Sequence, residues 1–249
     1  MGLIPSANAG RTYFIADLHL ADERPVATGR FFRFLKEEAA GADALYILGD
    51  LFEAWVGDDD DEQVAHDVAR QLKSLAEAGT PVYFMHGNRD FMLAERYAAL
   101  SGMILLNDPT QVDLYGVSTL LMHGDTLCTD DTAYQTFRRR VRHPLTRALL
   151  RRLPRALRRR MARHARAGSE SAKAAKPSAI MDVNVDEVVR VLTAHHAVRL
   201  IHGHTHRPAQ HVHAVAGQAC ERWVVPDWYT CWGYVVCDAA GCTLKVADL

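Results

Sequence analysis

Five short apolar runs in this chain each end abruptly in an aspartate or a histidine, and this pattern constrains the fold more than any other feature. The runs are residues 13–16 before Asp17, 46–48 before Gly49 and Asp50, 82–85 before His86, 120–122 before His123, and 198–201 before His202. Runs of this length without polar alternation are typical of strands that are buried on both faces of a sheet. Such sheets carry their chemistry at the carboxyl ends of the strands, so we expect these polar residues to converge on one site.

The segments between the first three runs predict helices, which makes this half of the sheet mainly parallel. Pro25 can begin a helix that extends to Gly41, and two further helices are expected over 61–78 and about 91–100. Each helix connects two strands as a right-handed crossover.

From residue 103 the pattern changes to more strands and one more helix. Strands are expected at 103–106, 111–115 and 117–122, and near 209–214, 221–225, 232–237 and 242–246. Tyr115-Gly116 predicts a hairpin, and Asn184 and Glu187 have the N-cap and N3 spacing for a helix over about 185–195. We therefore predict an α/β fold with two packed sheets and helices outside. A single domain should span 1–249, with a cap inserted at about 130–182.

The charges of this chain are strongly segregated. The formal net charge is −1, and 49% hydrophobic with 24% charged residues is the balance of a soluble globular protein. However, residues 58–61 are all aspartate, whereas residues 138–166 contain thirteen arginines and no acidic residue.

Cysteine usage and hydropathy predict a cytoplasmic protein. The five cysteines are odd in number and form no CxxC pair, so we expect reduced thiols and no zinc-thiolate site. The N-terminus lacks the charged and apolar regions of a secretory signal, and no window approaches the roughly 18 apolar residues of a membrane span. Any membrane contact should be peripheral.

The residues at the ends of the runs form a set of candidate metal ligands. Asp17 and His19 lie two apart and can point to the same side at a strand end, and His204 and His206 repeat this spacing. The full set is Asp17, His19, Asp50, Asn88, His123, His204 and His206. Carboxylate, imidazole and amide donors suit Mn²⁺, Fe²⁺ or Zn²⁺. Seven ligands are too many for one ion, but two ions bridged by Asp50, roughly 3.5–4 Å apart, would use them all.

Each motif alone has a simpler interpretation. An Asp-x-His pair is often a surface or capping pair, and Gly-Asp or Gly-Asn often marks a turn. Histidines at i and i+2 are poor core residues, so His204 and His206 are more specific. The occurrence of five such strand ends in one chain favours the metal site.

These residues resemble the motif of the calcineurin-like metallophosphoesterases. The matching segments are Asp17-Leu18-His19, Gly49-Asp50, Gly87-Asn88-Arg89-Asp90, His123 and Gly203-His204-Thr205-His206. More narrowly, the chain resembles the pyrophosphatase family that cleaves UDP-2,3-diacylglucosamine in lipid A synthesis. That resemblance extends from residue 16 to 208 and includes LGDLFEAWVGDD, HGNRDF, HGDTLCTDD, IMDVN and HGHTHRP.

The resemblance implies a four-layer αββα sandwich of two mixed sheets with an inserted α-helical cap. It implies two Mn²⁺ ions, one held by Asp17, His19, Asp50 and His206, the other by Asp50, Asn88, His123 and His204. Asp50, Asn88, Arg89 and His123 would be catalytic. Substrate contacts would come from Asn88, Arg89, Asp131, Ser169, Lys176 and His204, with Lys173 where the family often has asparagine. Asp131 can also be the N-cap of the helix that follows it.

The implied reaction is hydrolysis of the pyrophosphate bond to UMP and 2,3-diacylglucosamine 1-phosphate, with attack on the uridine-side phosphorus. Arg89 favours this reaction independently. In the superfamily the residue after Gly-Asn is histidine, which can protonate a poor alkoxide leaving group. Arginine stays charged and can only stabilise charge, so it suits a phosphate leaving group that needs no proton. The alternatives are another nucleotide or phosphodiester substrate, and a scaffold that has lost catalysis.

The arginine-rich segment also carries an apolar residue at every fourth position. These residues are Phe137, Val141, Leu145, Leu149, Leu153, Leu157 and Met161, and Pro144 and Pro154 interrupt them. The pattern predicts short amphipathic helices, each opened by a proline. The stripe can either dock on the core or form an acyl-chain chamber with a membrane-facing surface. Nucleic acid is a poorer partner than the anionic inner-membrane surface, because few aromatics interleave the arginines. We expect a monomer.

Overall fold

The structure is a computed structural model that describes residues 10–175 and 182–248, apart from the side chains of 169–175. The strands are β1 (Thr12–Ile15), β2 (Ala44–Ile47), β3 (Val82–Met85), β4 (Met103–Leu106), β5 (Thr110–Leu114), β6 (Val117–Met122), β7 (Arg199–His202), β8 (Ala209–Val215), β9 (Gln218–Val224), β10 (Cys231–Asp238) and β11 (Gly241–Asp248). The α-helices are α1 (Pro25–Phe34), α2 (Gln63–Glu77), α3 (Glu95–Ser101), α4 (Thr132–Val141), α5 (Pro144–Arg152), α6 (Arg155–Ala175) and α7 (Val185–Ala194). A π-helical turn over Leu35–Ala39 extends α1, and a short 3-10 helix spans Asp125–Leu127.

The strands form two mixed sheets, as expected. One has the order β11-β10-β1-β2-β3-β4 and the other β5-β6-β7-β9-β8. In the first sheet β1 to β4 are parallel, and in the second β6, β7 and β9 are parallel. The carboxyl ends of β1, β2 and β3 therefore lie at one edge of their sheet, and those of β6 and β7 lie together in the other.

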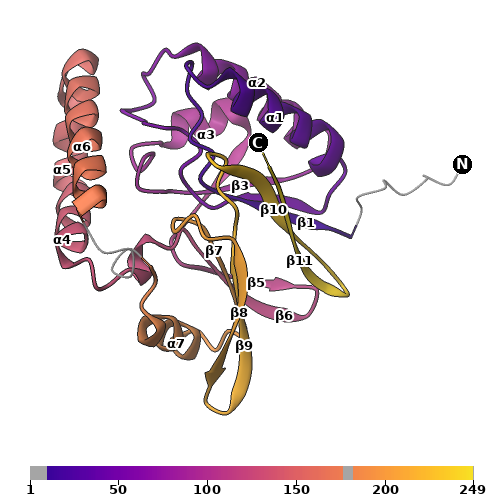
Figure 1. Cartoon of the computed structure of the whole chain (residues 1–249). Coiled ribbons are helices and arrows are strands. Elements are labelled where there is room, and N and C mark those ends of the chain that lie inside the picture. The colour runs from indigo at the N-terminus through magenta and orange to yellow at the C-terminus, as the bar shows by residue number, and fades with distance from the viewer. Residues whose placement is uncertain (1–9, 176–181, 249) are drawn as a thin grey trace, which may run out of the picture.

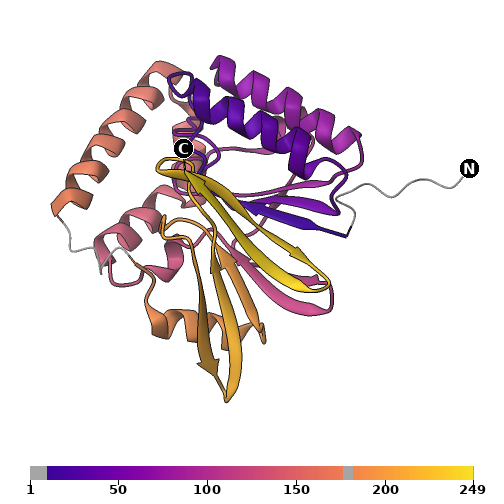
Figure 2. The same ribbon diagram turned by 45° about the vertical axis from the view of Figure 1, so that its right-hand side comes forward.

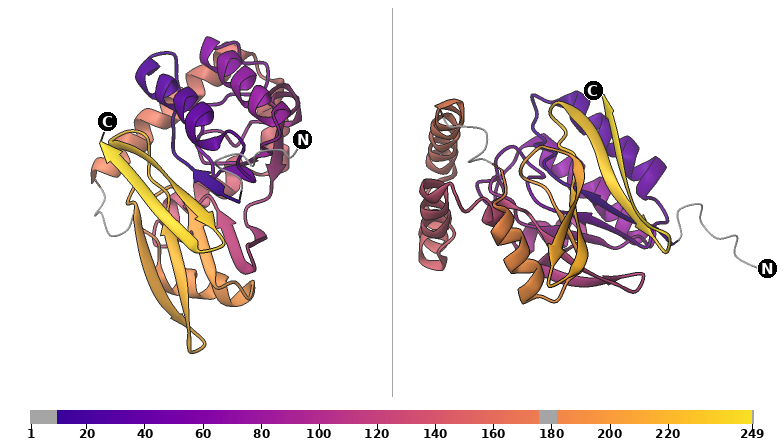
Figure 3. Two further views of the ribbon diagram at one scale, coloured as in Figure 1. Left: turned by 90° about the vertical axis from the view of Figure 1, so that its right-hand side faces the viewer. Right: turned by 60° about the horizontal axis from the view of Figure 1, so that its bottom comes forward.

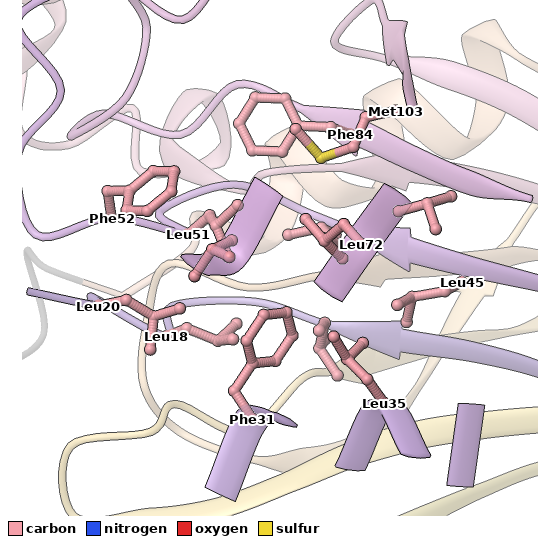
Figure 4. Packing of buried hydrophobic residues seen from close by; sticks show 14 of the residues in the cluster. Leu18, Leu20, Phe31, Leu35, Leu45, Leu51, Phe52, Leu72, Phe84 and Met103 are labelled. Atoms are coloured by element: carbon pink, nitrogen blue, oxygen red, sulfur yellow. The ribbon is translucent and has the colours of Figure 1, made fainter. Parts of the chain in front are cut away.

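Three hydrophobic clusters separate four layers. One packs β1 and β2 against α1, α2 and α3; a second lies between the sheets; a third joins β6 and β7 to α7. Alternation along β1 shows how one strand serves two clusters, because Tyr13 belongs to the first and Phe14 to the second. Figure 4 shows the first cluster, including Phe31 of α1, Leu45 of β2 and Leu72 of α2. The αββα sandwich is confirmed.

Helix α3 begins later than the sequence predicts. The expected helix over about 91–100 starts at Glu95, because the carboxylate of Asp58 accepts hydrogen bonds from the backbone N–H groups of Ala94 (2.9 Å) and Tyr97 (3.0 Å). A residue from the loop after β2 thus satisfies the free N–H groups at this helix end. By contrast, the predicted cap of α7 is local and confirmed, since Asn184 accepts from the N–H of Glu187.

Helices α4, α5 and α6 form a separate group beside the two sheets (Figures 1 and 2). Figure 3 shows the same arrangement from two further directions. Pro144 is the first residue of α5, and Pro154 directly precedes α6, so each proline opens a helix as predicted. None of the helices in the described ranges has the length and apolarity needed to cross a membrane.

One expectation about the cysteines is wrong. The structure joins Cys237 and Cys242 in a disulfide, whereas Cys128, Cys220 and Cys231 are not disulfide-bonded. The two bonded residues face each other in the register of β10 and β11, with Cα atoms 4.0 Å apart. The register of a hairpin decides which cysteines meet, and the sequence spacing alone does not specify that register.

Candidate metal centre

The polar loops that follow β1, β2, β3, β6 and β7 meet where the two sheets come together. Within the first sheet the N–H of Asp17 donates to the carbonyl of Gly49, and within the second the N–H of Gly203 donates to the carbonyl of His123. Between the sheets, the N–H of His204 donates to Oδ2 of Asp17 at 2.7 Å. These hydrogen bonds bring the ends of strands from both sheets to one place.

Several candidate ligands have a left-handed backbone, although none of them is glycine. The φ angles are 54° at Asp17, 51° at His19, 53° at Asp50, 69° at His204 and 54° at His206. A residue other than glycine in this region costs on the order of 1–3 kcal/mol, and such residues cluster at functional sites. Hydrogen bonds between the loops hold this conformation, as where the N–H of His19 donates to the carbonyl of Asp50 at 3.0 Å.

Glycines beside the ligands allow the loops to approach. A Cβ atom at Gly87 would lie 2.0 Å from Oδ1 of Asp50, and one at Gly203 would lie 2.4 Å from Oδ2 of Asp17. Both distances are far below van der Waals contact. The glycines of the Gly-Asn and Gly-His segments are therefore needed for close packing against the carboxylates.

Asp17, His19 and His206 place potential ligand atoms within 4.8 Å of one another. Nε2 of His206 lies 3.4 Å from Oδ1 of Asp17, and Nε2 of His19 lies 4.0 Å from the same oxygen. Oδ1 of Asp17 and both ring nitrogens of His19 are buried without a hydrogen-bond partner among the described residues. Buried polar atoms without partners are costly, so Oδ1 of Asp17 and Nε2 of His19, which face each other, fit a bound cation.

His123 and Asn88 form the other side of the site. Nδ1 of His123 donates to the carbonyl of Leu48 at 2.8 Å, which leaves Nε2 facing Oδ1 of Asn88 at 3.2 Å and Oδ1 of Asp50 at 4.0 Å. Asp17, Asp50 and His123 make a second group with potential ligand atoms within 4.8 Å. The ring of His204 lies 5.0 Å from that of His123.

Asp50 belongs to the second group and also approaches the first. Its Oδ2 is 3.9 Å from Nε2 of His19, while its Oδ1 faces His123 and also accepts the N–H of Arg89 at 2.7 Å. This position is compatible with the expected bridging role. Among the described residues, however, Asp17 is the one that belongs to both three-residue groups.

Burial and the neighbouring carboxylates shift the pKa values of several candidate ligands. Burial raises the pKa of Asp50, and although burial alone would lower that of His123, Asp50 and Asp125 raise it to about 9. Burial lowers the pKa of the His19 imidazole well below its usual value, which keeps the ring neutral. A divalent cation would supply the missing positive charge and take the place of a proton on the ligands.

The expected substrate contacts are only partly described. The carboxylate of Asp131 accepts the N–H of Tyr134 at 3.0 Å, so its N-cap role is confirmed. Arg89 is half-buried next to Asp50. Ser169 and Lys173 lie on α6, but their side chains are outside the described residues, as is Lys176 entirely.

Sequence reasoning missed the residues that surround His19. Arg24 donates to the carbonyls of Leu18 (3.0 Å) and His19 (2.8 Å), and its guanidinium lies 3.9 Å from the centre of the Tyr229 ring. Oε2 of Glu53 lies 3.7 Å from Nδ1 of His19. Glu53 belongs to the quoted LGDLFEAWVGDD segment, but no spacing rule assigns it a role.

A buried carboxylate anchors α4 to the core. Oδ2 of Asp125 accepts from the hydroxyl of Tyr134 and Nε of Arg138, both at 2.7 Å, and from Arg142 at 3.3 Å. Arg142 also donates to the carbonyl of Gly87 at 2.8 Å. The first cap helix therefore contacts the loop after β3 and the loop after β6.

The acidic and basic segments of the sequence meet in the fold. Arg155 pairs with Asp61 at 2.7 Å, Arg158 pairs with Asp59, and Arg159 pairs with Asp61 at 2.7 Å and with Asp60. Part of the arginine excess is thus neutralised internally, which the sequence analysis did not anticipate. Seven cap arginines have no carboxylate within ion-pair distance among the described side chains: residues 139, 140, 147, 151, 152, 160 and 163.

Most of the apolar cap stripe does not dock on the core. Its exposed members are Phe137 (52%), Leu145 (76%), Leu149 (61%), Leu157 (43%) and Met161 (44%). One residue outside the stripe, Leu150, packs against the first core cluster.

Comparison with known proteins places the chain in a family. Residues 10–208 match the sequence profile of the calcineurin-like phosphoesterases. The chain is 51% identical over 219 residues to the UDP-2,3-diacylglucosamine hydrolase of Enterobacter sp. strain 638, covering 88% of this chain and 91% of that protein. Hydrolases of the same name from Klebsiella pneumoniae and Salmonella paratyphi C are also 51% identical, with the same coverage. This chain belongs to the calcineurin-like phosphoesterase family.

Proposed function

We propose that this protein hydrolyses the pyrophosphate bond of UDP-2,3-diacylglucosamine, giving UMP and 2,3-diacylglucosamine 1-phosphate in lipid A synthesis. The observation that carries the proposal is a buried cluster of carboxylates and imidazoles beside a cap with exposed leucines. Three relatives that are 51% identical over 88% of this chain have the corresponding name. A metal cluster suits the pyrophosphate, and an apolar cap suits the acyl chains.

Two Mn²⁺ ions are the proposed cofactors. Asp17, His19, Asp50 and His206 would hold one ion, and Asp50, Asn88, His123 and His204 the other. The support is that Oδ1 of Asp17 and Nε2 of His19 are buried and have no hydrogen-bond partner among the described residues. When bound, such ions activate water and stabilise charge on phosphoryl oxygens.

The side chains of this chain orient the ligands and bind the substrate. The hydrogen bond from His123 to Leu48 fixes the proton on Nδ1 and directs Nε2 into the site. Arg89, held at its backbone by Asp50, supplies a permanent positive charge for phosphate oxygens. Asp131, Ser169, Lys173 and Lys176 are proposed substrate contacts on or beside the cap helices.

The cap at about 130–182 is the proposed acyl-chain and membrane surface of a single domain spanning 1–249. Leu145 and Leu149 are exposed, and seven cap arginines lack acidic partners among the described side chains. Exposed apolar residues beside arginines favour an anionic lipid surface. A cytoplasmic monomer that binds the inner membrane peripherally is consistent with this surface, and no nucleic-acid partner is proposed.

The test measures UMP release from UDP-2,3-diacylglucosamine with added Mn²⁺, after chelation, and after readdition of Mn²⁺. UDP-glucosamine without acyl chains and simple phosphodiesters serve as comparison substrates. We expect UMP release that requires Mn²⁺ and is much faster on the diacylated substrate. Equal or faster cleavage of a simple phosphodiester would instead support the alternative, a phosphoesterase with another substrate.

A further inference from the structure

Glu53 is a buried carboxylate between a candidate metal ligand and the cap. Only 7% of its side chain is exposed. Its Oε2 lies 3.7 Å from Nδ1 of His19 and accepts a hydrogen bond from the hydroxyl of Tyr229. Its Oε1 lies 3.3 Å from Nε of Arg166, on α6. Three groups from different parts of the chain therefore meet at one side chain.

The two nitrogens of His19 face different surroundings. Nε2 faces the carboxylates of Asp17 and Asp50, at 4.0 and 3.9 Å, so it is the nitrogen available to a cation. Nδ1 faces Glu53. A histidine that binds a metal through Nε2 carries its proton on Nδ1, and an acceptor for that proton fixes both the tautomer and the ring orientation.

The contacts of Glu53 suit it to that task. Tyr229 donates to Oε2, the oxygen that faces His19, and Arg166 lies beside Oε1, so both carboxylate oxygens are restrained. The ring of Tyr229 also lies 4.9 Å from the ring of His19. Arg166 belongs to the cap, whereas His19 belongs to the loop after β1. The carboxylate therefore connects the position of α6 to the geometry of the metal site.

We propose that Glu53 is a positioning residue that fixes the tautomer and orientation of His19, and that Arg166 couples this effect to the docking of α6. The inference rests on the proposed role of His19 as a metal ligand. Coupling between two sites is reciprocal. Docking of α6 should therefore strengthen metal binding, and metal binding should stabilise the docked position of α6.

The test compares Glu53→Gln with a matched control, Glu221→Gln, in the absence of substrate. Glu221 also pairs with an arginine, Arg199 at 2.8 Å, but at the end of β7 opposite to the metal site. Mn²⁺ affinity is measured by titration calorimetry, and the melting temperature of each chelated protein checks the fold. We expect Glu53→Gln to weaken binding of Mn²⁺ about 10- to 100-fold, as is usual for partners of metal-bound histidines. Glu221→Gln should bind Mn²⁺ like the wild type, and Glu53→Asp should recover part of the affinity.

A Glu53→Gln variant with wild-type Mn²⁺ affinity would overturn the inference. A wild-type protein that binds no Mn²⁺ would instead overturn the ligand assignment itself. Arg166→Gln, at a side chain that is 41% exposed, tests the link to the cap without disturbing the core. As a single substitution, Arg166→Gln should weaken Mn²⁺ binding. Combined with Glu53→Gln, it should cause no further loss of Mn²⁺ affinity, and additive losses would refute coupling through Glu53. Hydrogen exchange of α6 amides should slow on addition of Mn²⁺ in the wild type and not in Glu53→Gln.

Discussion

Replacement of Gly87 by alanine should disable the metal site through a single added methyl group. The new Cβ would lie 2.0 Å from Oδ1 and 2.3 Å from the backbone nitrogen of Asp50. A carbon and an oxygen in contact normally lie about 3.3 Å apart or more, so Asp50 must shift by roughly 1 Å. A misplacement of about 1 Å at a catalytic site costs on the order of 10²-fold in rate. Overpacking of this kind also costs about 1–3 kcal/mol of stability.

The assay follows kcat/KM for UMP release, Mn²⁺ affinity and the melting temperature of the Gly87→Ala variant. Gly29→Ala is the matched control, because no heavy atom lies within 4 Å of a Cβ at that position on α1. We expect a loss of roughly 10²-fold in kcat/KM with weakened Mn²⁺ binding for Gly87→Ala. Gly29→Ala should keep full activity and be slightly more stable. Wild-type Mn²⁺ affinity and rate in Gly87→Ala would show that the approach of Asp50 to this glycine does not set the site geometry.

Three further variants test the metal ligands, the apolar stripe of the cap and the docking of the cap. Asp50→Asn should lose Mn²⁺ and activity together, and near-normal turnover with two bound ions would contradict the bridging assignment. Leu149→Asp combined with Leu153→Asp should raise KM for the diacylated substrate strongly, whereas an equal loss on a short, soluble UDP-sugar would indicate a structural cap. Arg158→Met should lower the free energy of unfolding by about 2 kcal/mol, because it removes charged hydrogen bonds to Asp59. Chemical denaturation measures this change, and Arg160→Met is the control that should leave the stability unchanged. Equal stability of the two arginine variants would contradict the role of this ion pair.

The strands, the layers and the meeting of the ligand loops could be predicted because they follow from local pattern. An apolar run that ends in Asp17 or His123 predicts both a buried strand and the polar residue at its end. Because neighbouring strands are parallel, such ends lie together at one edge of the sheet. The N-cap Asn184 is likewise a local signal. Here the sequence and the fold agree because each interaction lies within a few residues or follows from a general rule of sheets.

Interactions between distant segments could not be predicted in this way. Arg158 and Asp59 are 99 residues apart, and Asp58 accepts from Ala94, the N-cap residue of α3, which lies 36 residues later. The Cys237–Cys242 disulfide depends on the register of one hairpin. In each case the partner is chosen by tertiary packing, so the sequence shows the charge or the thiol but not what it meets. The arginine-rich cap is an example. Its positive charge predicts an anionic lipid partner, but aspartates of the same chain neutralise part of that charge.

The last prediction concerns which phosphorus is attacked. The backbone of Arg89 is held by Oδ1 of Asp50 at 2.7 Å, so this arginine lies beside the proposed bridging carboxylate. A guanidinium stabilises phosphate oxygens but cannot protonate a leaving group. If water attacks the uridine-side phosphorus, the glycosyl phosphate leaves as a monoester that needs no proton, which suits arginine at this position. Hydrolysis in ¹⁸O-water should therefore place the label in UMP, as read by mass spectrometry of both products. Label in the lipid phosphate would refute this direction of attack, and full activity of Arg89→His would remove the argument from leaving-group chemistry.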